Sequence, residues 1–346
     1  MERGSSRSYA GLLNLQADRH WTVFVTDFPL PRSDVKRLRE ELPPETRPLF
    51  VRIDRGLPGI GRELRKAGVD RGRDYVSLQP LLKSFRSIAS VHRLFGAFTH
   101  VDLARLDLPF AGTRFRTSYV RSLLDVVMRA DYGEQERIAN RFFELLEERR
   151  PYRVTVRTLG EATLLVSDDR PWFDLSGRMH EGESRALPGG EVAYTGDGID
   201  GEFIVDGALL ASPQTPRVGR LAAKLGRVSA SLQPSPLRLR IARGRVEDAV
   251  GNRQLSSTLT RLFRADDRYR NVTEVGISFN RACARFVHDW PAASNEGHPG
   301  VHVALGGDPE RSDEHQPGGP PLVHLDLMAA TAEVTVNATR FLRSSA

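Results

Sequence analysis

The pattern of apolar and polar positions divides the chain into an N-terminal part that mixes strands with helices and a C-terminal part made mainly of strands. In the first part, residues 21–25 and 49–53 have the apolar runs of buried strands, and residues 34–42 between them have the pattern of a short helix. Residues 118–149 follow with two stretches of apolar positions at helical spacing. We therefore predict an α/β domain over residues 1–150.

The second part of the chain has the sequence pattern of short strands separated by turns. Residues 152–156, 162–166 and 201–206 alternate apolar and polar positions, which is typical of half-buried strands. One helix, predicted over residues 254–264, interrupts this pattern. We therefore predict a β-rich α+β domain over residues 151–346, so that the chain as a whole belongs to the α/β class.

Two strands near the C-terminus carry polar side chains that a buried strand rarely contains. Their sequences are VHVAL at residues 301–305 and VHLDL at residues 323–327. Residues two apart in a strand share a face, so His324 and Asp326 project together, and His302 projects away from the valines of its own strand. Burying an unpaired carboxylate costs several kcal/mol or forces its protonation, so these positions need partners.

Two further acids occupy similar positions. Glu274 alternates with apolar residues in TEVGI at 273–277, and Glu191 follows the turn PGG at 188–190. Two histidines and three carboxylates form a nitrogen and oxygen ligand set that suits zinc, cobalt or manganese, and a bridging carboxylate would make it a two-metal centre. The alternative is that they are unrelated residues on a wetted sheet face, because His-x-Asp alone is a common sequence.

Composition restricts the classes of protein to which the chain can belong. The 346 residues are 40% hydrophobic and contain no run of about 18 apolar residues, so we expect a globular protein without a membrane span. Residues 1–10 lack the apolar stretch of a signal peptide, and we expect a cytoplasmic location. Cys283 is the only cysteine, which excludes an internal disulfide and a thiolate-rich zinc site.

The charge balance of the chain is basic. A net charge of +6 and a pI near 9.7 would suit an anionic partner. The basic residues are nevertheless spread along the chain among 44 acids, and no basic stripe is interleaved with aromatic residues. We therefore expect no nucleic-acid partner.

Five short motifs in the second part of the chain occur in a distinctive order. They are LPGGEV, DGEFIVDG, TEVGISFN, GVHVALG and VHLD, at residues 187–192, 200–207, 273–280, 300–306 and 323–326. Their order resembles the thermophilic metalloprotease family of aminopeptidases, which includes aminopeptidase T and aminopeptidase S. The resemblance covers residues 152–342 and lies in the order of the motifs more than in any single one.

This resemblance implies a metallopeptidase-like domain that removes N-terminal residues from peptides by means of a metal-activated water. It also implies a homodimer and a pair of divalent ions, such as zinc, cobalt or manganese. The ligands that it implies are Glu191, Glu274, His302, His324 and Asp326.

One departure from the family leaves the function open. Pro309 stands where the family has a tyrosine thought to act at the metals, and no catalytic residue can be assigned in its place. The first hypothesis is a divergent metal-dependent aminopeptidase-like peptide hydrolase. The alternative is a non-catalytic peptide-binding protein on a hydrolase scaffold, for example one that guides a precursor peptide in the biosynthesis of a peptide natural product.

Overall fold

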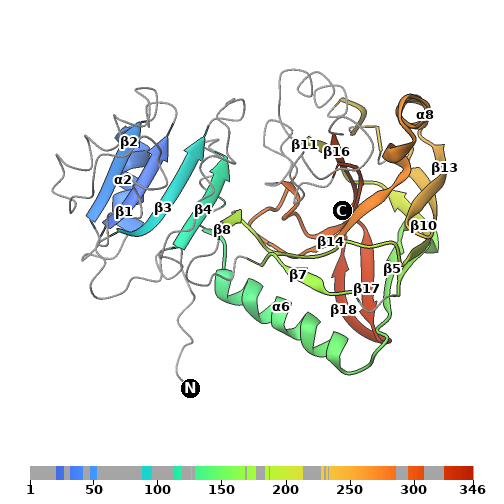
Figure 1. Ribbon diagram of the computed structural model, residues 1–346, viewed down its shortest axis with the longest axis horizontal. Coiled ribbons are helices and arrows are strands. Elements are labelled where there is room, and N and C mark those ends of the chain that lie inside the picture. Colours follow the sequence, from blue (N-terminus) through green and yellow to red (C-terminus); the bar gives the residue numbers. More distant parts are fainter. Residues whose placement is uncertain are drawn as a thin grey trace. The chain divides into compact units, whose positions relative to one another are not determined.

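The computed structural model contains two compact units (Figure 1). Unit 1 comprises Met1–Glu134 and Gly177–Gly189, and unit 2 comprises Gln135–Ser176 and Gly190–Ala346. The structure describes residues 21–26, 32–41, 47–52, 88–95, 113–118, 126, 129–167, 170–176, 184–186, 188–212, 227–229, 231–232, 234–285, 295–307 and 323–345.

Unit 1 contains a parallel sheet with the strand order β2-β1-β3-β4-β8. Its strands are β1 (Trp21–Thr26), β2 (Arg47–Arg52), β3 (Ile88–Phe95), β4 (Thr113–Ser118) and β8 (Ser184–Ala186). Parallel strands need a crossover connection, and helix α2 (Arg32–Glu41) lies in the one between β1 and β2. The predicted α/β character of the N-terminal part is confirmed. The helical stretch predicted near residues 118–130 lies largely outside the described residues.

Unit 2 is built on two antiparallel sheets, with the strand orders β13-β12-β10-β6-β5-β17-β18 and β11-β16-β15-β14-β9-β7. The first sheet consists of β5 (Val154–Thr158), β6 (Thr163–Val166), β10 (Ile199–Val205), β12 (Leu237–Ala242), β13 (Arg245–Gly251), β17 (Ala332–Val336) and β18 (Thr339–Ser344). The second consists of β7 (Trp172–Asp174), β9 (Glu191–Tyr194), β11 (Leu209–Ser212), β14 (Val272–Ser278), β15 (Gly300–Gly306) and β16 (His324–Ala329). Short 3₁₀ turns lie at η3 (Leu159–Glu161) and η4 (Asp267–Arg270).

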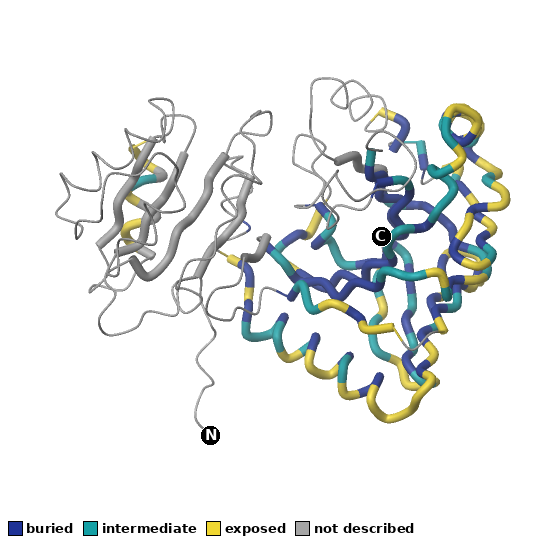
Figure 2. Tube along the Cα trace, viewed as in Figure 1, coloured by how far each residue is buried: buried dark blue, intermediate teal, exposed yellow. Residues whose placement is uncertain are grey.

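Apolar residues from both sheets of unit 2 form one buried cluster. Alternate residues of each strand contribute to it, as Val154 and Val156 do in β5 and Val275 and Ile277 do in β14, because side chains two apart share a face. Figure 2 shows how continuously these strands are buried. The β-rich character predicted for the C-terminal part is confirmed.

Two helices complete unit 2. Helix α6 (Tyr132–Glu147) packs its apolar stripe onto the cluster, with the ring of Phe142 centred 4.8 Å from that of Trp172. Helix α8 (Arg253–Ala265) begins where the side chain of Asn252 accepts a hydrogen bond from the backbone N–H of Leu255. The predicted helix at residues 254–264 is thereby confirmed, while the domain boundary at residues 150/151 stays a prediction. Among the described residues, no helix has the length and apolar character needed to span a membrane.

Candidate metal centre

One face of the six-stranded sheet gathers the polar residues that the sequence singled out. Directly opposed residues of neighbouring antiparallel strands share a face. Gly276 of β14 lies opposite His302 of β15 and Ala193 of β9, and Ala304 of β15 lies opposite Glu274 and Asp326. The opposite face of the same strands carries the valines and leucines of the core. All five residues, Glu191, Glu274, His302, His324 and Asp326, therefore project from the same face of the sheet.

The five side chains form a continuous series of close contacts. Nε2 of His302 lies 3.4 Å from Oε1 of Glu191 and 4.0 Å from Oε1 of Glu274. Nε2 of His324 lies 3.5 Å from Oε2 of Glu274 and 2.9 Å from Oδ1 of Asp326. Glu274 thus has one oxygen toward each histidine, and it links the two halves of the cluster.

Small residues leave the space in which the cluster sits. Gly276 lies in the middle of β14, between His302 and Ala193 on the neighbouring strands. A Cβ atom at Gly276 would overlap the imidazole of His302 and a carboxylate oxygen of Glu191. A glycine inside a strand often marks such a close approach, so we assign Gly276 to the floor of the site.

His302 is in a form suited to binding a cation. Its side chain is 0% exposed, and neither of its ring nitrogens has a hydrogen-bond partner in the described part of the chain. Burial lowers the pKa of His302 to about 4, against the attraction of Asp326, so the ring is neutral at physiological pH. A neutral imidazole with an unused lone pair is the form that ligates metals.

His324 is oriented by a backbone carbonyl. Nδ1 of His324 lies 2.5 Å from the carbonyl oxygen of Gly307, so the ring donates its Nδ1–H there and directs Nε2 toward the acids. Burial lowers the pKa of His324, but Asp326 and Glu274 outweigh it and raise the value to about 10. In the metal-free protein a proton on Nε2 therefore partly neutralises the acids, and a cation would replace that proton.

The structure adds one acid that the sequence did not indicate. Glu296 lies in the turn before β15, and its carboxyl group interacts with that of Asp326 and lies near Glu274 and His324. Burial, with the charges of Asp326 and Glu274, raises the pKa of Glu296 well above its usual range. Burial also acts to raise the pKa of Asp326, but its pairing with His324 lowers that pKa below its usual value.

These observations fit a divalent cation. Ligand atoms of Glu191, Glu274 and His302 all lie within 4.8 Å of one another, so this triad can bind a metal ion. Glu274 is 12% exposed and the other two are buried, which favours a cation enclosed by protein. Neither carboxylate oxygen of Asp326 has a well-aligned hydrogen-bond partner among the described residues, which is the condition that a nearby cation relieves.

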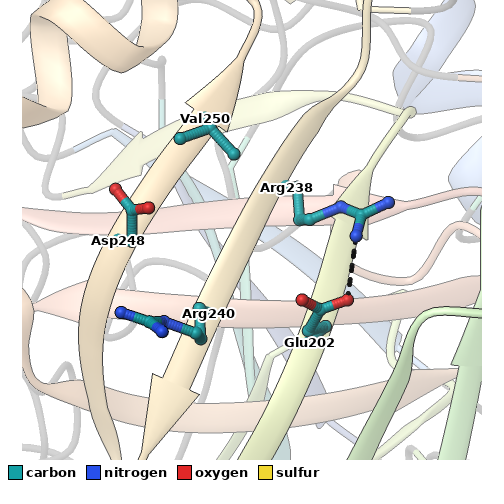
Figure 3. Close-up of a pocket in the computed structure, with 5 residues that line it drawn as sticks. All are labelled: Glu202, Arg238, Arg240, Asp248 and Val250. Atoms are coloured by element: carbon teal, nitrogen blue, oxygen red, sulfur yellow. Dashed lines mark hydrogen bonds and ion pairs between the residues drawn. The ribbon is translucent and has the colours of Figure 1, made fainter.

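Two other polar features of the described residues give no sign of a ligand. A shallow hollow of about 240 Å³ on the outer face of the seven-stranded sheet is lined by Arg238 and Arg240 (Figure 3). Both arginines are half-exposed and pair with acids, Arg238 with Glu202 at 3.0 Å and Arg240 with Glu247 at 3.3 Å, as is usual on a solvated sheet face. Burial raises the pKa of Cys283 to about 12, which disfavours the thiolate form that acts as a nucleophile.

Two comparisons place the chain beside known proteins. Residues 184–313 match the family model of the crocagin biosynthetic protein CgnE/B. The matched stretch contains the whole triad. The fold is similar to that of 2,5-dihydroxypyridine dioxygenase from Pseudomonas putida KT2440, with a TM-score of 0.57 and 12% sequence identity over 98% of this chain and 95% of that one. No curated protein matches the chain.

These findings correct the family assignment made from the sequence. Four of the five motifs that suggested the thermophilic aminopeptidases lie within residues 184–313, and that stretch matches a biosynthetic family instead. The structure reported above as similar to this chain is also that of a dioxygenase and not of a peptidase. The assignment to aminopeptidases, and the hydrolase and metalloprotease character taken from it, are wrong. Pro309, which the resemblance made important, lies outside the described residues.

Proposed function

We propose that this chain is a metal-binding protein of natural-product biosynthesis, which holds a divalent ion at Glu191, Glu274 and His302. The observation that carries this proposal is His302, whose two ring nitrogens are buried beside two carboxylates without a hydrogen-bond partner in the described structure. The match of residues 184–313 to a biosynthetic family supports the assignment to natural-product biosynthesis. We expect the reaction or binding event served by the metal to belong to such a pathway.

Each residue of the centre has a distinct part in this proposal. His302 offers a neutral nitrogen and Glu191 an anionic oxygen, while Glu274 offers one oxygen to each half of the cluster. His324 is held by the carbonyl of Gly307 with Nε2 toward the same space, and Asp326 adds a further carboxylate. A bound divalent ion would supply a Lewis acid and lower the pKa of a water on it.

We propose two ions that share Glu274, because its oxygens point to different histidines. Nitrogen and oxygen ligands of this kind suit zinc, cobalt or manganese. Two carboxylates and one imidazole, as in Glu191, Glu274 and His302, are also ligands that Fe²⁺ accepts, so Fe²⁺ belongs among the candidates. The structurally similar protein is a dioxygenase, so oxygen chemistry is worth testing with that ion.

The test is metal binding by the purified full-length chain. Chelator-treated protein is titrated with Mn²⁺, Zn²⁺, Co²⁺ and, in the absence of oxygen, Fe²⁺, and the heat of binding is measured by calorimetry. Thermal unfolding is then recorded with and without each ion. An ion whose free concentration is 100 times its dissociation constant should stabilise the folded state by about 2.7 kcal/mol. We expect this gain to be reduced in His302→Ala, which removes a ligand of the first ion, and to persist in full in His298→Ala, which alters a histidine outside the cluster. Absence of binding by the unaltered protein for every ion would refute the proposal.

A second candidate function is capture of a peptide without catalysis. The match to a family described as biosynthetic, together with the loss of the peptidase assignment, favours it over peptide hydrolysis. In this case the chain, as a homodimer, would bind a precursor peptide and present it to modifying enzymes. Tight binding of a precursor peptide encoded beside this gene, with the peptide recovered intact by mass spectrometry, is the expected result. Chemical change of the peptide by the metal-loaded protein alone would exclude a purely binding role.

A further inference from the structure

Ser278 lies at the end of β14, on the same face of the sheet as the metal centre. Side chains two apart in a strand share a face, so Glu274, Gly276 and Ser278 form one row. Ile277, between the last two, belongs to the apolar core instead. The pairing of β14 with β9 sets Ser278 directly opposite Glu191. The row therefore ends beside a ligand of the proposed first ion.

The hydroxyl group of Ser278 is buried and makes no hydrogen bond to the described part of the chain. The residue is 0% exposed, and its Oγ atom has no hydrogen-bond partner there. Burying a hydroxyl group without a hydrogen bond costs free energy, so buried groups of this kind are normally paired with protein, ordered water or a ligand. Beside a metal site, such a hydroxyl group points to a bound group that the chain does not itself supply.

The position of Glu191 shows where that bound group would lie. Its Oε1 atom lies against the position that a Cβ atom would take at Gly276. Ser278 follows two residues further along the same face, about 7 Å away at the rise of an extended strand. The Ser278 hydroxyl makes no direct hydrogen bond to this carboxylate. One water molecule or ligand oxygen can bridge a gap of this size.

The triad supplies fewer ligands than a divalent ion takes. Glu191, Glu274 and His302 offer three ligand atoms within 4.8 Å of one another. Zinc sites with three protein ligands complete their coordination with a water molecule or a substrate atom. At least one position on the ion is therefore left for an oxygen ligand from outside the chain, and the buried hydroxyl of Ser278 lies on the Glu191 side of it.

We propose that Ser278 hydrogen-bonds a water molecule on the ion held by the triad, and so positions the oxygen ligand that replaces this water when a substrate binds. This inference rests on the proposed metal-binding function and adds a residue that does not itself touch the metal. A serine hydroxyl suits both states of the site. It accepts a hydrogen bond from a water and, after rotation about its C–O bond, donates one to an anion in the same place.

The competing role for Ser278 is to hold the carboxylate of Glu191 once a metal is bound. Ser278→Ala separates the two roles. Loss of a group that orients a metal ligand weakens binding of the ion itself. Loss of a group that holds only the external ligand leaves the affinity for the ion unchanged and weakens the binding of a small anion to that ion.

The experiment measures fluoride binding to the metal-loaded full-length chain. Fluoride is close to hydroxide in size and accepts hydrogen bonds. Protein loaded with the divalent ion that it binds most tightly is titrated with sodium fluoride in a calorimeter. We expect the dissociation constant of fluoride to rise at least about 10-fold in Ser278→Ala, because a hydrogen bond to a charged group is lost. The affinity for the ion should not change.

Ser256→Ala is the matched control. Its hydroxyl is also buried without a hydrogen-bond partner in the described structure, but it belongs to helix α8 and not to the sheet of the metal centre. Fluoride binding should be unaltered in this variant. Thermal unfolding of the metal-free proteins checks that each variant is folded, and Ser278→Gly repeats the test if the alanine variant is not.

Each outcome decides a different statement. Unchanged fluoride affinity in Ser278→Ala would overturn the role of Ser278 and leave the metal centre intact. A weaker affinity for the ion itself in that variant would assign Ser278 to the support of Glu191, and would also overturn it. Absence of fluoride binding by the metal-loaded unaltered protein would show that no exchangeable ligand lies beside Ser278. If the unaltered protein binds none of the divalent ions, the proposed function itself is refuted.

Discussion

The two faces of the six-stranded sheet in unit 2 are made from alternate residues of the same strands, yet they differ in almost every property. On one face, Val275, Ile277 and Val303 are 0% exposed and belong to the apolar cluster shared with the other sheet. On the opposite face, Glu274 and His302 face each other across a glycine floor. The period of two in an extended strand thus separates the residues that hold the fold together from those that hold the site.

Burial has opposite energetic consequences on the two faces. Apolar side chains gain about 25 cal/mol for each Å² removed from water, so burial on the first face stabilises the fold. Carboxylates and imidazoles lose hydration when buried, so burial on the second face costs free energy until a proton or a cation compensates. Substitutions on the first face should change stability, and those on the second should change what the protein binds.

Two adjacent residues of β14, one on each face, provide the strongest test of this difference. Ile277→Ala leaves a cavity in the core and should lower the free energy of unfolding by about 2–5 kcal/mol, with or without metal. Ser278→Ala is the matched control. Its hydroxyl is buried without a hydrogen-bond partner among the described residues, so its removal should change stability by less than about 0.5 kcal/mol or increase it. Chemical denaturation measures both, and equal losses for the two variants would contradict the separation.

Gly276→Ala should have the second largest effect, and on binding more than on stability. The new methyl group would overlap the imidazole of His302 and a carboxylate oxygen of Glu191, and so fill the space proposed for a metal ion. We expect the affinity for the first divalent ion to fall at least about 10- to 100-fold, which corresponds to about 1.4–2.7 kcal/mol. Calorimetric titration of the chelator-treated variant measures it. Unchanged affinity would place the ion elsewhere than beside His302.

The fold and the local placement of the site residues could be predicted because they depend on short-range patterns. Alternation within a strand already put His324 and Asp326 on one face, and the structure agrees. The distance of 3.4 Å between His302 and Glu191 could not be predicted, because it depends on the pairing of β14 with both β9 and β15, across more than 100 residues of sequence. Register between distant strands is a property of the whole sheet.

Two further features escaped sequence reasoning for other reasons. Glu296 lies in an Asn-Glu-Gly turn, and such turns are usually solvated, so no pattern distinguished it from an ordinary loop acid. Its only signal was its position six residues before His302. The family was mistaken because motifs of four to eight residues, such as GVHVALG, describe a buried strand with one polar residue. That arrangement indicates a ligand position, but it does not specify the reaction performed there.

The smallest predicted effect is the pH dependence of the metal-free protein. His302 has a pKa of about 4 in the folded state, below its usual value of 6.5, so its contribution to stability is lost as the pH falls from 6.5 toward 4. His324 has a pKa of about 10, so its contribution is present below pH 6.5 and is lost as the pH rises toward 10. The two histidines together should therefore contribute most to the stability of the metal-free protein near pH 6.5.

The alkaline side of this pH profile tests whether the acids of the polar face are neutralised by the proton on His324 or by a bound cation. Between about pH 7 and about pH 9 we expect the metal-free protein to lose about 1–2 kcal/mol, measured by denaturation in urea. The loss should be smaller in His324→Asn, where the raised pKa of Glu296 still contributes, and unchanged in His298→Ala. It should vanish when saturating metal is bound, because a cation then replaces the proton on Nε2 of His324 and does not leave as the pH rises. The same alkaline slope in His324→Asn would show that His324 is not the group whose proton balances Asp326.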